Sequence, residues 1–387
     1  MERHIVANFA YGTGPYLRAT ELGIAFNDEL EKRGRPRMSI IVPWVYGEKQ
    51  KRVMLEGFAA HAASRPDEVL LDKKLGAYLK TVFYGDNTYE EALAKWIQVE
   101  SSLRPQISGY LSGTLDLETL SGRRIGAEGR DIAVQLSRSP RLSFGIQPAY
   151  FTSFAYVGEI LERAGRVKEI AVSGELLKKG IAAADRVERE QTLRCIAYPA
   201  TFSFLKDRTP RYQGEILTPP IASPLGLNSD KLGPGIFVTI TGIPGLERLY
   251  GDARRLGLTL YSNDVSAVPG SIRMLPRVIP NGNILFQFAR AGWSSIWISM
   301  ISGTPLLVPE FDPADDPEIY FNNRSVEELG LGMVWRGEGL EEILKRADGL
   351  RRSSAGVREE VLGRWGTLDG NRYSAKLFAD DFLKRSG

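Results

Sequence analysis

The sequence has almost no cysteine and almost no histidine. Cys195 is its one cysteine, so no disulfide can form within the chain, and no Cys-x-x-Cys pair or Cys/His cluster is present to hold zinc. His4 and His61 are the two histidines, which leaves few positions for a histidine base or metal ligand. A reducing compartment is therefore expected, and mechanisms built on several histidines are excluded.

Long apolar runs and an excess of one charge are also missing. No run of about 18 or more apolar residues occurs, and Met1 to Ala10 lack the apolar stretch of a secretion signal. Lys and Arg number 50 against 47 Asp and Glu, and the two signs are mixed along the chain. Proteins that bind a phosphate backbone usually show a basic face. We therefore expect a cytoplasmic protein that binds no nucleic acid and contacts membranes only peripherally.

The length and composition favour two domains. Of the 387 residues, 43% are hydrophobic and 25% charged, which is typical of a globular protein with enough apolar material for two cores. Helix breakers cluster in the middle of the chain, as in Thr218-Pro219-Pro220 and Gly233-Pro234-Gly235. The predicted organisation is an N-terminal domain (1–200), a Pro/Gly-rich connection (201–235), a C-terminal domain (236–369) and a terminal helix (370–387).

Both predicted domains alternate strand and helix. In the first, a strand at 5–9, the turn Gly12-Thr13-Gly14, an amphipathic helix ending at Lys32 and a strand at 38–42 indicate a parallel sheet with a ligand crevice at its carboxyl edge. The other predicted elements are a mainly helical stretch (48–106), a strand (132–136), a helix (156–163), and, in the second domain, strands at 236–241, 258–262, 271–275, 284–288 and 306–309 around helices at 246–256 and 289–300. The predicted fold class is α/β, with two Rossmann-like doubly wound domains.

The glycine turns are not those of a dinucleotide-binding protein. Gly12-Thr13-Gly14 lacks a third glycine, and no acidic residue ends the second strand region at 38–43. NAD is therefore not expected. Gly242 occupies the corresponding turn of the second domain, where it either approaches a ligand or only permits a tight turn from strand to helix.

A resemblance emerges from three motifs in the second domain. They are Arg290-Ala291-Gly292-Trp293-Ser294-Ser295, Gly303-Thr304-Pro305 and Asp315-Asp316-Pro317-Glu318. Together they resemble the nucleotide-sugar signature of the GT-B glycosyltransferase superfamily, which contains UDP-glycosyltransferases and the peptidoglycan N-acetylglucosaminyltransferase. The similarity covers residues 236–330 and extends over the N-terminal domain only in outline.

The resemblance implies an architecture and a division of labour. Two Rossmann-like domains would face a central cleft, with the acceptor on the side of the first domain and the nucleotide sugar on the second. The last helix, 370–387, would cross back to the first domain. The co-substrate implied is a nucleotide-diphosphate sugar, with UDP as the expected nucleotide, and no separate cofactor or metal is expected because no Asp-x-Asp metal motif stands in a suitable place.

The chemistry of the motif residues agrees with a diphosphate site. Gly292 lets the backbone approach a phosphate, and Ser294 and Ser295 at a helix start offer N–H and hydroxyl donors, unless they only cap the helix. Arg290 adds a charge-assisted hydrogen bond. The resemblance places Asp315 and Asp316, and less clearly Glu318 and Asn322, on the sugar hydroxyls. The alternative for these acids is a solvated loop.

The sequence departs from the family at two positions. Ile298 stands where the family usually has a glutamate for the ribose hydroxyls, so ribose recognition must differ or be weaker. Tyr16 follows the first glycine turn where the family often has a histidine, so a histidine base at that turn is excluded. An inverting enzyme would then need a carboxylate, and Asp131 and Glu159 are the candidates, whereas a retaining enzyme would need no protein base. The candidates for the acceptor side are Gly14, Tyr16 and Arg138.

The leading interpretation is a glycosyltransferase that moves a hexose from a nucleotide sugar to an acceptor hydroxyl. The acceptor would be a saccharide, lipid or protein. Two alternatives remain open from the sequence. One is a sugar-nucleotide epimerase or hydrolase of the same fold, and the other is an inactive binding or scaffold protein, which the departures at Tyr16 and Ile298 favour.

Overall fold

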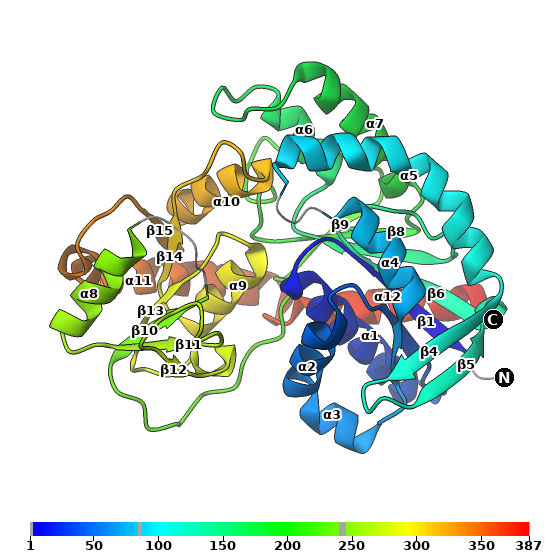
Figure 1. The fold of residues 1–387 in the computed structure, drawn as a ribbon, viewed down its shortest axis with the longest axis horizontal. Helices are drawn as coiled ribbons and strands as arrows, with labels where there is room; N and C mark the ends of the chain where they lie inside the picture. The colour runs from blue at the N-terminus through cyan, green and yellow to red at the C-terminus, as the bar shows by residue number, and fades with distance from the viewer. Residues whose placement is uncertain (1–2, 84–86, 240–244, 387) are drawn as a thin grey trace. The chain divides into compact units, whose positions relative to one another are not determined.

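In the computed structural model the chain forms two compact units, each with its own sheet (Figure 1). The structure describes residues 3–83, 87–239 and 245–386. Unit 1 comprises Met1–Ala197, Leu205–Thr218 and Asn371–Gly387, and unit 2 comprises Tyr198–Phe204 and Pro219–Gly370. The stretch 201–235 is thus divided, because 205–218 belongs to unit 1, whereas 201–204 and 219–235 belong to unit 2. The terminal helix belongs to unit 1 from Asn371 onward.

Unit 1 contains a nine-stranded sheet in the order β5-β4-β3-β2-β1-β6-β7-β8-β9. The pairs from β3 through β9 are parallel, and a hairpin adds β4 and β5 in antiparallel pairing. The strands are β1 (His4–Phe9), β2 (Ser39–Pro43), β3 (Val69–Asp72), β4 (Thr114–Thr119), β5 (Arg124–Glu128), β6 (Ile132–Arg138), β7 (Ala149–Ser153), β8 (Leu193–Ala197) and β9 (Glu215–Thr218). The direction of winding reverses between β1 and β6, which is where doubly wound sheets hold ligands at the carboxyl edge.

Helices cover both faces of this sheet. Their bounds are α1 (Thr13–Lys32), α2 (Gly47–Gly57), α3 (Ala59–Ser64), α4 (Lys73–Val82), α5 (Tyr89–Leu111), η1 (Gly129–Asp131), α6 (Val157–Ala164), α7 (Gly174–Arg189) and α12 (Gly370–Ser386). α1 packs on β1, β2 and β6 through the predicted stripe Leu22, Phe26 and Leu30, which is buried. α12 joins the same layer because Phe26 contacts Phe382, with ring centroids 5.7 Å apart. α4, α5, α6 and α7 pack against one another as the second layer.

Unit 2 contains a six-stranded parallel sheet in the order β12-β11-β10-β13-β14-β15. In chain order this is 3-2-1-4-5-6, the arrangement of a Rossmann-type sheet. The strands are β10 (Gly235–Val238), β11 (Thr259–Ser262), β12 (Ile272–Arg273), β13 (Ile284–Phe288), β14 (Leu306–Pro309) and β15 (Gly332–Trp335). The helices are α8 (Leu246–Arg255), η2 (Pro276–Val278), α9 (Trp293–Ser302), α10 (Pro317–Glu328) and α11 (Leu340–Trp365).

Alternate residues of β10 point to two different cores in unit 2. Ile236 and Val238 join a core with α8 and α11, whereas Phe237 faces a core that includes Ile298 of α9. The sheet is therefore covered on both faces, as its short apolar strands predict. The predicted strands at 284–288 and 306–309 agree with β13 and β14 to the residue.

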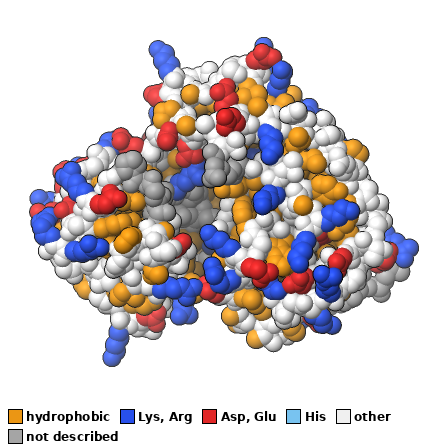
Figure 2. All heavy atoms as spheres, viewed as in Figure 1, with side chains coloured by type: hydrophobic (Ala, Val, Ile, Leu, Met, Phe, Trp, Pro, Cys, Tyr) orange, Lys and Arg blue, Asp and Glu red, His pale blue; other side chains and the backbone are white. Residues whose placement is uncertain are grey.

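The surface and the helices carry few extreme features. Figure 2 shows acidic and basic side chains interspersed on the face in view, in keeping with the nearly balanced charge. None of the helices in the described part of the chain combines the length and the apolar character that a bilayer crossing requires.

Candidate functional site

The carboxyl edge of the unit 2 sheet is built around the start of α9. β13 ends at Phe288 and the chain reaches α9 at Trp293 through Arg290, Ala291 and Gly292. This loop follows the strand beside β10, where the winding of the sheet reverses. The first N–H groups of α9 therefore point toward the position at which such sheets bind ligands.

Gly292 is open on the side where a side chain would stand. Its φ is −86°, which any residue adopts. A Cβ built on Gly292 would meet no described atom within 4 Å. Neither strain nor packing within the described chain therefore calls for glycine here, and the open space suits close approach of a ligand to the backbone.

Gly292, the N-cap residue of α9, has no side chain that could cap the helix start. The N-cap side chains of Asp72, Thr88, Ser173 and Asp316 cap α4, α5, α7 and α10. The N-cap residues of α1, α2, α3, α6, α8 and α11 provide no such hydrogen bond, as in α9. Ser294 and Ser295 lie half-buried in the first turn of α9 and do not serve as its cap. An uncapped helix start with a glycine before it is a favourable place for an anion.

Arg290 and Asp315 form an ion pair across this edge. The Asp315 carboxylate also accepts the backbone N–H of Asp316, at 2.7 Å. Burial raises the pKa of Asp315, and the Arg290 guanidinium opposes that shift. The structure thus pairs Arg290, which was predicted to bind the diphosphate, with Asp315, which was predicted to bind the sugar.

The remaining acidic residues belong to the start of α10. Asp316 is buried and caps α10 by accepting the N–H of Glu318, at 2.9 Å. The Glu318 carboxylate accepts a hydrogen bond from Asn322 Nδ2, at 3.0 Å. Like Asp315, these two predicted sugar ligands therefore also have structural contacts. Gly242 lies outside the described residues.

Unit 1 presents an aromatic cluster at the carboxyl edge of β1 and β2. Its members are Phe9, Tyr11, Tyr16, Tyr46 and Phe83, whose neighbouring ring centroids are 5.8–6.4 Å apart. The Tyr46 hydroxyl accepts the N–H of Gly12, at 2.7 Å, and Gly12 needs its φ of +109° to turn the chain into α1. Burial raises the pKa of Tyr16 to about 12, so this phenol stays protonated at neutral pH.

The glycine turn and Arg138 meet at the same edge. Gly14 lies in the first turn of α1, two residues before Tyr16. Arg138 is the last residue of β6 and is 4% exposed. Burial lowers its pKa, with the charge of Arg18 acting in the same direction and that of Glu21 against it. The strand predicted at 132–136 extends further, to Arg138, and this residue is buried at its end.

The two candidate bases are placed poorly for proton transfer. Asp131 ends η1 just before β6 and so lies at the amino edge of the sheet, opposite the crevice. Glu159 lies in the first turn of α6 at the carboxyl edge, but its carboxylate accepts from Arg208 at 3.0–3.2 Å and from Arg163 at 3.3 Å. Both histidines also lie at the amino edge, His4 at the start of β1 and His61 in the helix that precedes β3.

Some residues of these edges escape a sequence analysis. Tyr46 and Phe83 complete the aromatic cluster, and Thr201 contacts Trp293 at the start of α9 and Asn322, which the sequence offered only as a weaker candidate for the sugar hydroxyls. Only Tyr46 carries a local signal, since it follows the predicted strand at 38–42. Thr201 and Asn322 are 121 residues apart, and no spacing pattern connects them.

No protein-family model and no curated protein matches this sequence. Solved structures match it over nearly the whole chain, and three of them represent the result. Medicago truncatula UGT71G1 complexed with UDP-glucose has a TM-score of 0.56 at 13% identity, covering 98% of each chain. A UDP-glucosyltransferase from Polygonum tinctorium capable of glucosylating indoxyl has a TM-score of 0.57 at 11% identity, covering 99% of each chain. The glycosyltransferase SnogD from Streptomyces nogalater has a TM-score of 0.56 at 12% identity, covering 99% of this chain and 100% of its own.

These comparisons define the class of fold. The chain has the two-domain α/β fold of GT-B glycosyltransferases, as the motifs of the second domain predicted. Within the described residues, no group of three or more His, Cys, Asp or Glu side chains gathers in a way that would hold a metal ion.

Proposed function

We propose that the protein is a glycosyltransferase that uses a nucleotide-diphosphate sugar as donor and an acceptor hydroxyl as nucleophile. The observation that carries this proposal is the uncapped start of α9 with open space at Gly292, at the switch point of a Rossmann-type sheet. Structures of similar fold that hold UDP or UDP-glucose support it.

The proposed donor site lies entirely on unit 2. The diphosphate would accept hydrogen bonds from the N–H groups of α9 and from Ser294 and Ser295, and Arg290 would add a positive charge. Asp315, held beside Arg290 by their ion pair, would accept hydrogen bonds from sugar hydroxyls. The Arg290–Asp315 pair would thus set the position of the sugar relative to the diphosphate.

The chemistry that follows is the breaking of one glycosidic bond and the making of another. The acceptor oxygen bonds to the anomeric carbon as the bond to the diphosphate oxygen breaks, and that electron pair leaves with the diphosphate. The hydroxyl proton of the acceptor passes to the departing diphosphate in a retaining reaction, or to a carboxylate base in an inverting one. The transition state resembles an oxocarbenium ion, so stabilising the departing negative charge lowers the barrier. The start of α9 and Arg290 would supply this stabilisation without a metal.

The acceptor would be bound by unit 1. The aromatic cluster around Tyr16 offers flat apolar surfaces, and Tyr11, 37% exposed, is its most accessible ring. Gly14 and Arg138 lie at the same edge of the sheet. These residues favour an acceptor that carries an apolar part beside its hydroxyl.

The proposal is tested by calorimetric titration of the wild-type chain with UDP, TDP, GDP, ADP and CDP. TDP belongs in the panel because Ile298, which packs in an apolar core, stands where the family usually has a glutamate for the ribose hydroxyls. A nucleotide whose sugar is not the usual ribose is therefore worth testing. We expect one diphosphate to bind in the micromolar range and Gly292→Asp to abolish that binding by adding a negative side chain in the open space. Binding of none of the five would contradict a donor site.

A second measurement separates transfer from other uses of the donor. The matching nucleotide sugar is incubated with and without a panel of phenolic and saccharide acceptors, and the free nucleotide is quantified. A transferase releases the nucleotide faster when an acceptor is present and forms a glycosylated product. Release at the same rate without any acceptor would indicate a hydrolase instead.

A further inference from the structure

A completely buried asparagine lies in the middle of α10. Asn322 is 0% exposed, yet its amide carries two donor N–H groups and an acceptor oxygen. Burying such a group is costly unless its hydrogen bonds are satisfied. The contacts of Asn322 therefore show what this residue holds in place.

The Asn322 amide makes four hydrogen bonds. Its Oδ1 accepts from Trp293 Nε1 at 2.8 Å and from Thr201 Oγ1 at 2.9 Å. Its Nδ2 donates to the carbonyl of Ala291 at 2.6 Å and to Glu318 Oε1 at 3.0 Å. The amide thus uses both donors and both acceptor positions, and its orientation is fixed by its partners.

These four partners come from different parts of unit 2. Ala291 immediately precedes Gly292, and Trp293 is the first residue of α9. Glu318 lies in the first turn of α10, and Thr201 belongs to the segment Tyr198–Phe204. A single side chain therefore connects both sides of the open position at Gly292 to α10 and to that segment.

The Thr201 end of this arrangement is itself held on α10. The Ser325 hydroxyl donates to the Thr201 carbonyl at 3.1 Å, and Phe202 packs edge-on against Phe321 with ring centroids 5.1 Å apart. Trp293 Nε1 also contacts Thr201 Oγ1 at 2.8 Å. Because every member supports another, the network favours one arrangement of the loop before α9.

We propose that the cluster of Thr201, Trp293 and Asn322 is a positioning element for diphosphate binding at the start of α9, with Asn322 as its central residue. This inference rests on the proposed function. Asn322 acts through the Ala291 carbonyl and the Trp293 indole, because it is completely buried. It sets the direction of the N–H groups that follow Gly292 and the position of the Glu318 carboxylate.

The test uses Asn322→Asp in the full chain, a change that preserves the size and shape of the side chain. The new carboxylate oxygen would face the Ala291 carbonyl and the Glu318 carboxylate in place of a donor, which repels both. Affinity is measured for UDP by calorimetry and for uridine by ligand-observed NMR, or for the matching pair of whichever base the wild type binds. We expect at least a ~10-fold weaker affinity for UDP and an unchanged affinity for uridine, because the nucleoside has no diphosphate.

Matched variants separate positioning from general damage. Asn281→Asp makes the same change at another buried asparagine of unit 2, whose Nδ2 donates to the Asp230 carbonyl at 2.9 Å at the amino edge of the sheet. We expect it to leave the UDP affinity of the folded protein unchanged. Thr201→Val removes the hydroxyl and should weaken UDP binding, and Thr201→Ser should restore it. This second pair carries the test if Asn322→Asp does not fold.

The outcomes distinguish the two proposals. If the wild type binds none of the nucleoside diphosphates, the donor site is wrong and this inference fails with it. If the wild type binds UDP and both Asn322→Asp and Thr201→Val bind it equally well, the donor site stands and the positioning role is wrong. An equal loss of UDP and uridine affinity would also overturn it, since that result indicates a disturbance of the whole unit.

Discussion

Gly292 and Gly303 stand at the two ends of α9 and are glycines for different physical reasons. Gly303 has φ +72° and ends the helix in a left-handed conformation, where a Cβ would also lie 3.0 Å from the Arg358 guanidinium. Gly292 has an ordinary φ and open space around its missing side chain. Gly303 is therefore required by the fold, whereas Gly292 is free to serve a ligand.

This difference predicts opposite results for the same substitution. Gly292→Ala should leave the free energy of unfolding unchanged or raise it by about 0.4–1 kcal/mol, because alanine restricts the unfolded chain. It should nevertheless weaken UDP binding roughly tenfold, since the methyl group would occupy the space of a phosphate. Gly303→Ala should cost about 1–2 kcal/mol of stability through its positive φ and leave the affinity of the folded protein unchanged. Urea unfolding and calorimetry measure both quantities, and a Gly292→Ala variant that binds UDP normally would contradict the proposed approach of the ligand.

Arg290 permits a second test at the scale of a residue. Arg290→Ala removes a charge that we place on the diphosphate and should weaken UDP binding by about 1.5–3 kcal/mol, as for hydrogen bonds to charged groups. Arg255→Ala is the matched control, because Arg255 pairs with Glu341 at 2.7 Å at the far end of α8 and its loss changes the net charge equally. Calorimetry at constant salt compares the two. Equal affinities for both variants would show that only the net charge matters.

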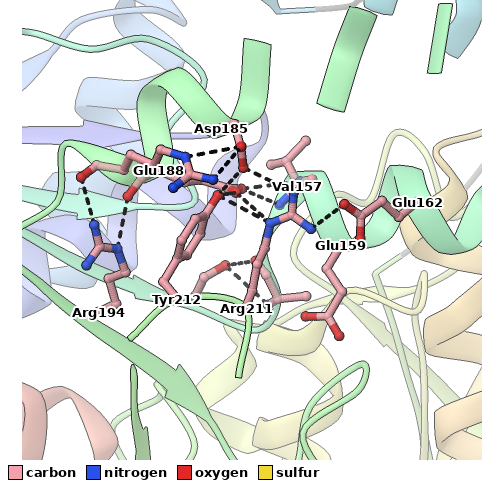
Figure 3. A network of polar contacts seen from close by, with 12 residues as sticks. Val157, Glu159, Glu162, Asp185, Glu188, Arg194, Arg211 and Tyr212 are labelled. Carbon is pink, nitrogen blue, oxygen red and sulfur yellow. Dashed lines mark hydrogen bonds and ion pairs between the residues drawn. The ribbon is translucent and has the colours of Figure 1, made fainter. Parts of the chain in front are cut away.

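At the scale of elements, a buried network attaches the segment 205–218 to α6 and α7 within unit 1 (Figure 3). Glu188 of α7 accepts the N–H groups of Val157 and Gly158 at 2.6 and 3.3 Å, and so occupies the start of α6 from inside the unit. The Tyr212 hydroxyl donates to Glu188 at 3.0 Å, and the Arg211 guanidinium lies 3.6 Å from it. Unlike the start of α9, this helix start is already filled by a carboxylate of the protein.

The network makes the stability of unit 1 depend on pH. Burial raises the pKa of Glu188 from 4.5 to about 7, while Arg211, Tyr212 and the two N–H groups oppose that shift. Between these two values the folded chain binds more protons than the unfolded chain, so this group's contribution to stability falls as the pH rises. Glu188→Gln removes the titration. The unfolding free energy of Glu188→Gln minus that of the wild type should therefore increase from pH 5 to pH 7, by up to about 1.4 kcal/mol per pH unit. Urea unfolding at several pH values measures this difference, and parallel curves for the two proteins would contradict the prediction.

Sequence patterns predicted some elements better than others, for physical reasons. β13 and β14 are short apolar runs buried on both faces and bounded by turn residues, so their limits follow from composition. β3 has only four residues among helices, and the hairpin of β4 and β5 is half exposed, so both escaped the analysis. At the site, Arg290 and Gly292 lie in one local motif and were predictable. The contact of Asn322 with Thr201 depends on the tertiary fold, which no local pattern encodes.

At the scale of the whole molecule, the chain passes between its two units more than once. Unit 1 takes its sequence from three segments and unit 2 from two. The segment Tyr198–Phe204 belongs to unit 2 although both of its flanking segments belong to unit 1. The proposed donor site therefore needs residues from before and after 205–218, and a fragment that begins at Pro219 would lack Thr201.

The closing helix offers a way to disturb one unit without touching the proposed donor site. α12 packs on unit 1 through Phe378, whose ring stacks on Tyr150 at 4.8 Å and 6°, and through Asp381, which accepts from the Tyr150 hydroxyl at 2.8 Å. Phe378 is 0% exposed, so Phe378→Ala should cost unit 1 about 3–5 kcal/mol. Phe378→Leu, which retains most of the apolar volume, should cost less.

Because each unit has its own core, we expect this loss to lower the melting transition of unit 1 alone. A ligand that binds unit 2 stabilises only the state in which that unit is folded, by about 2.7 kcal/mol at a hundredfold excess over its dissociation constant. UDP should thus raise the melting temperature of unit 2, whose transition Phe378→Ala leaves in place. It should not change the melting temperature of unit 1, which Phe378→Ala lowers. Scanning calorimetry of both proteins with and without UDP measures the four curves. If UDP instead restored the lowered transition, the donor would be bound by residues of unit 1 and the assignment of the site to α9 would be wrong.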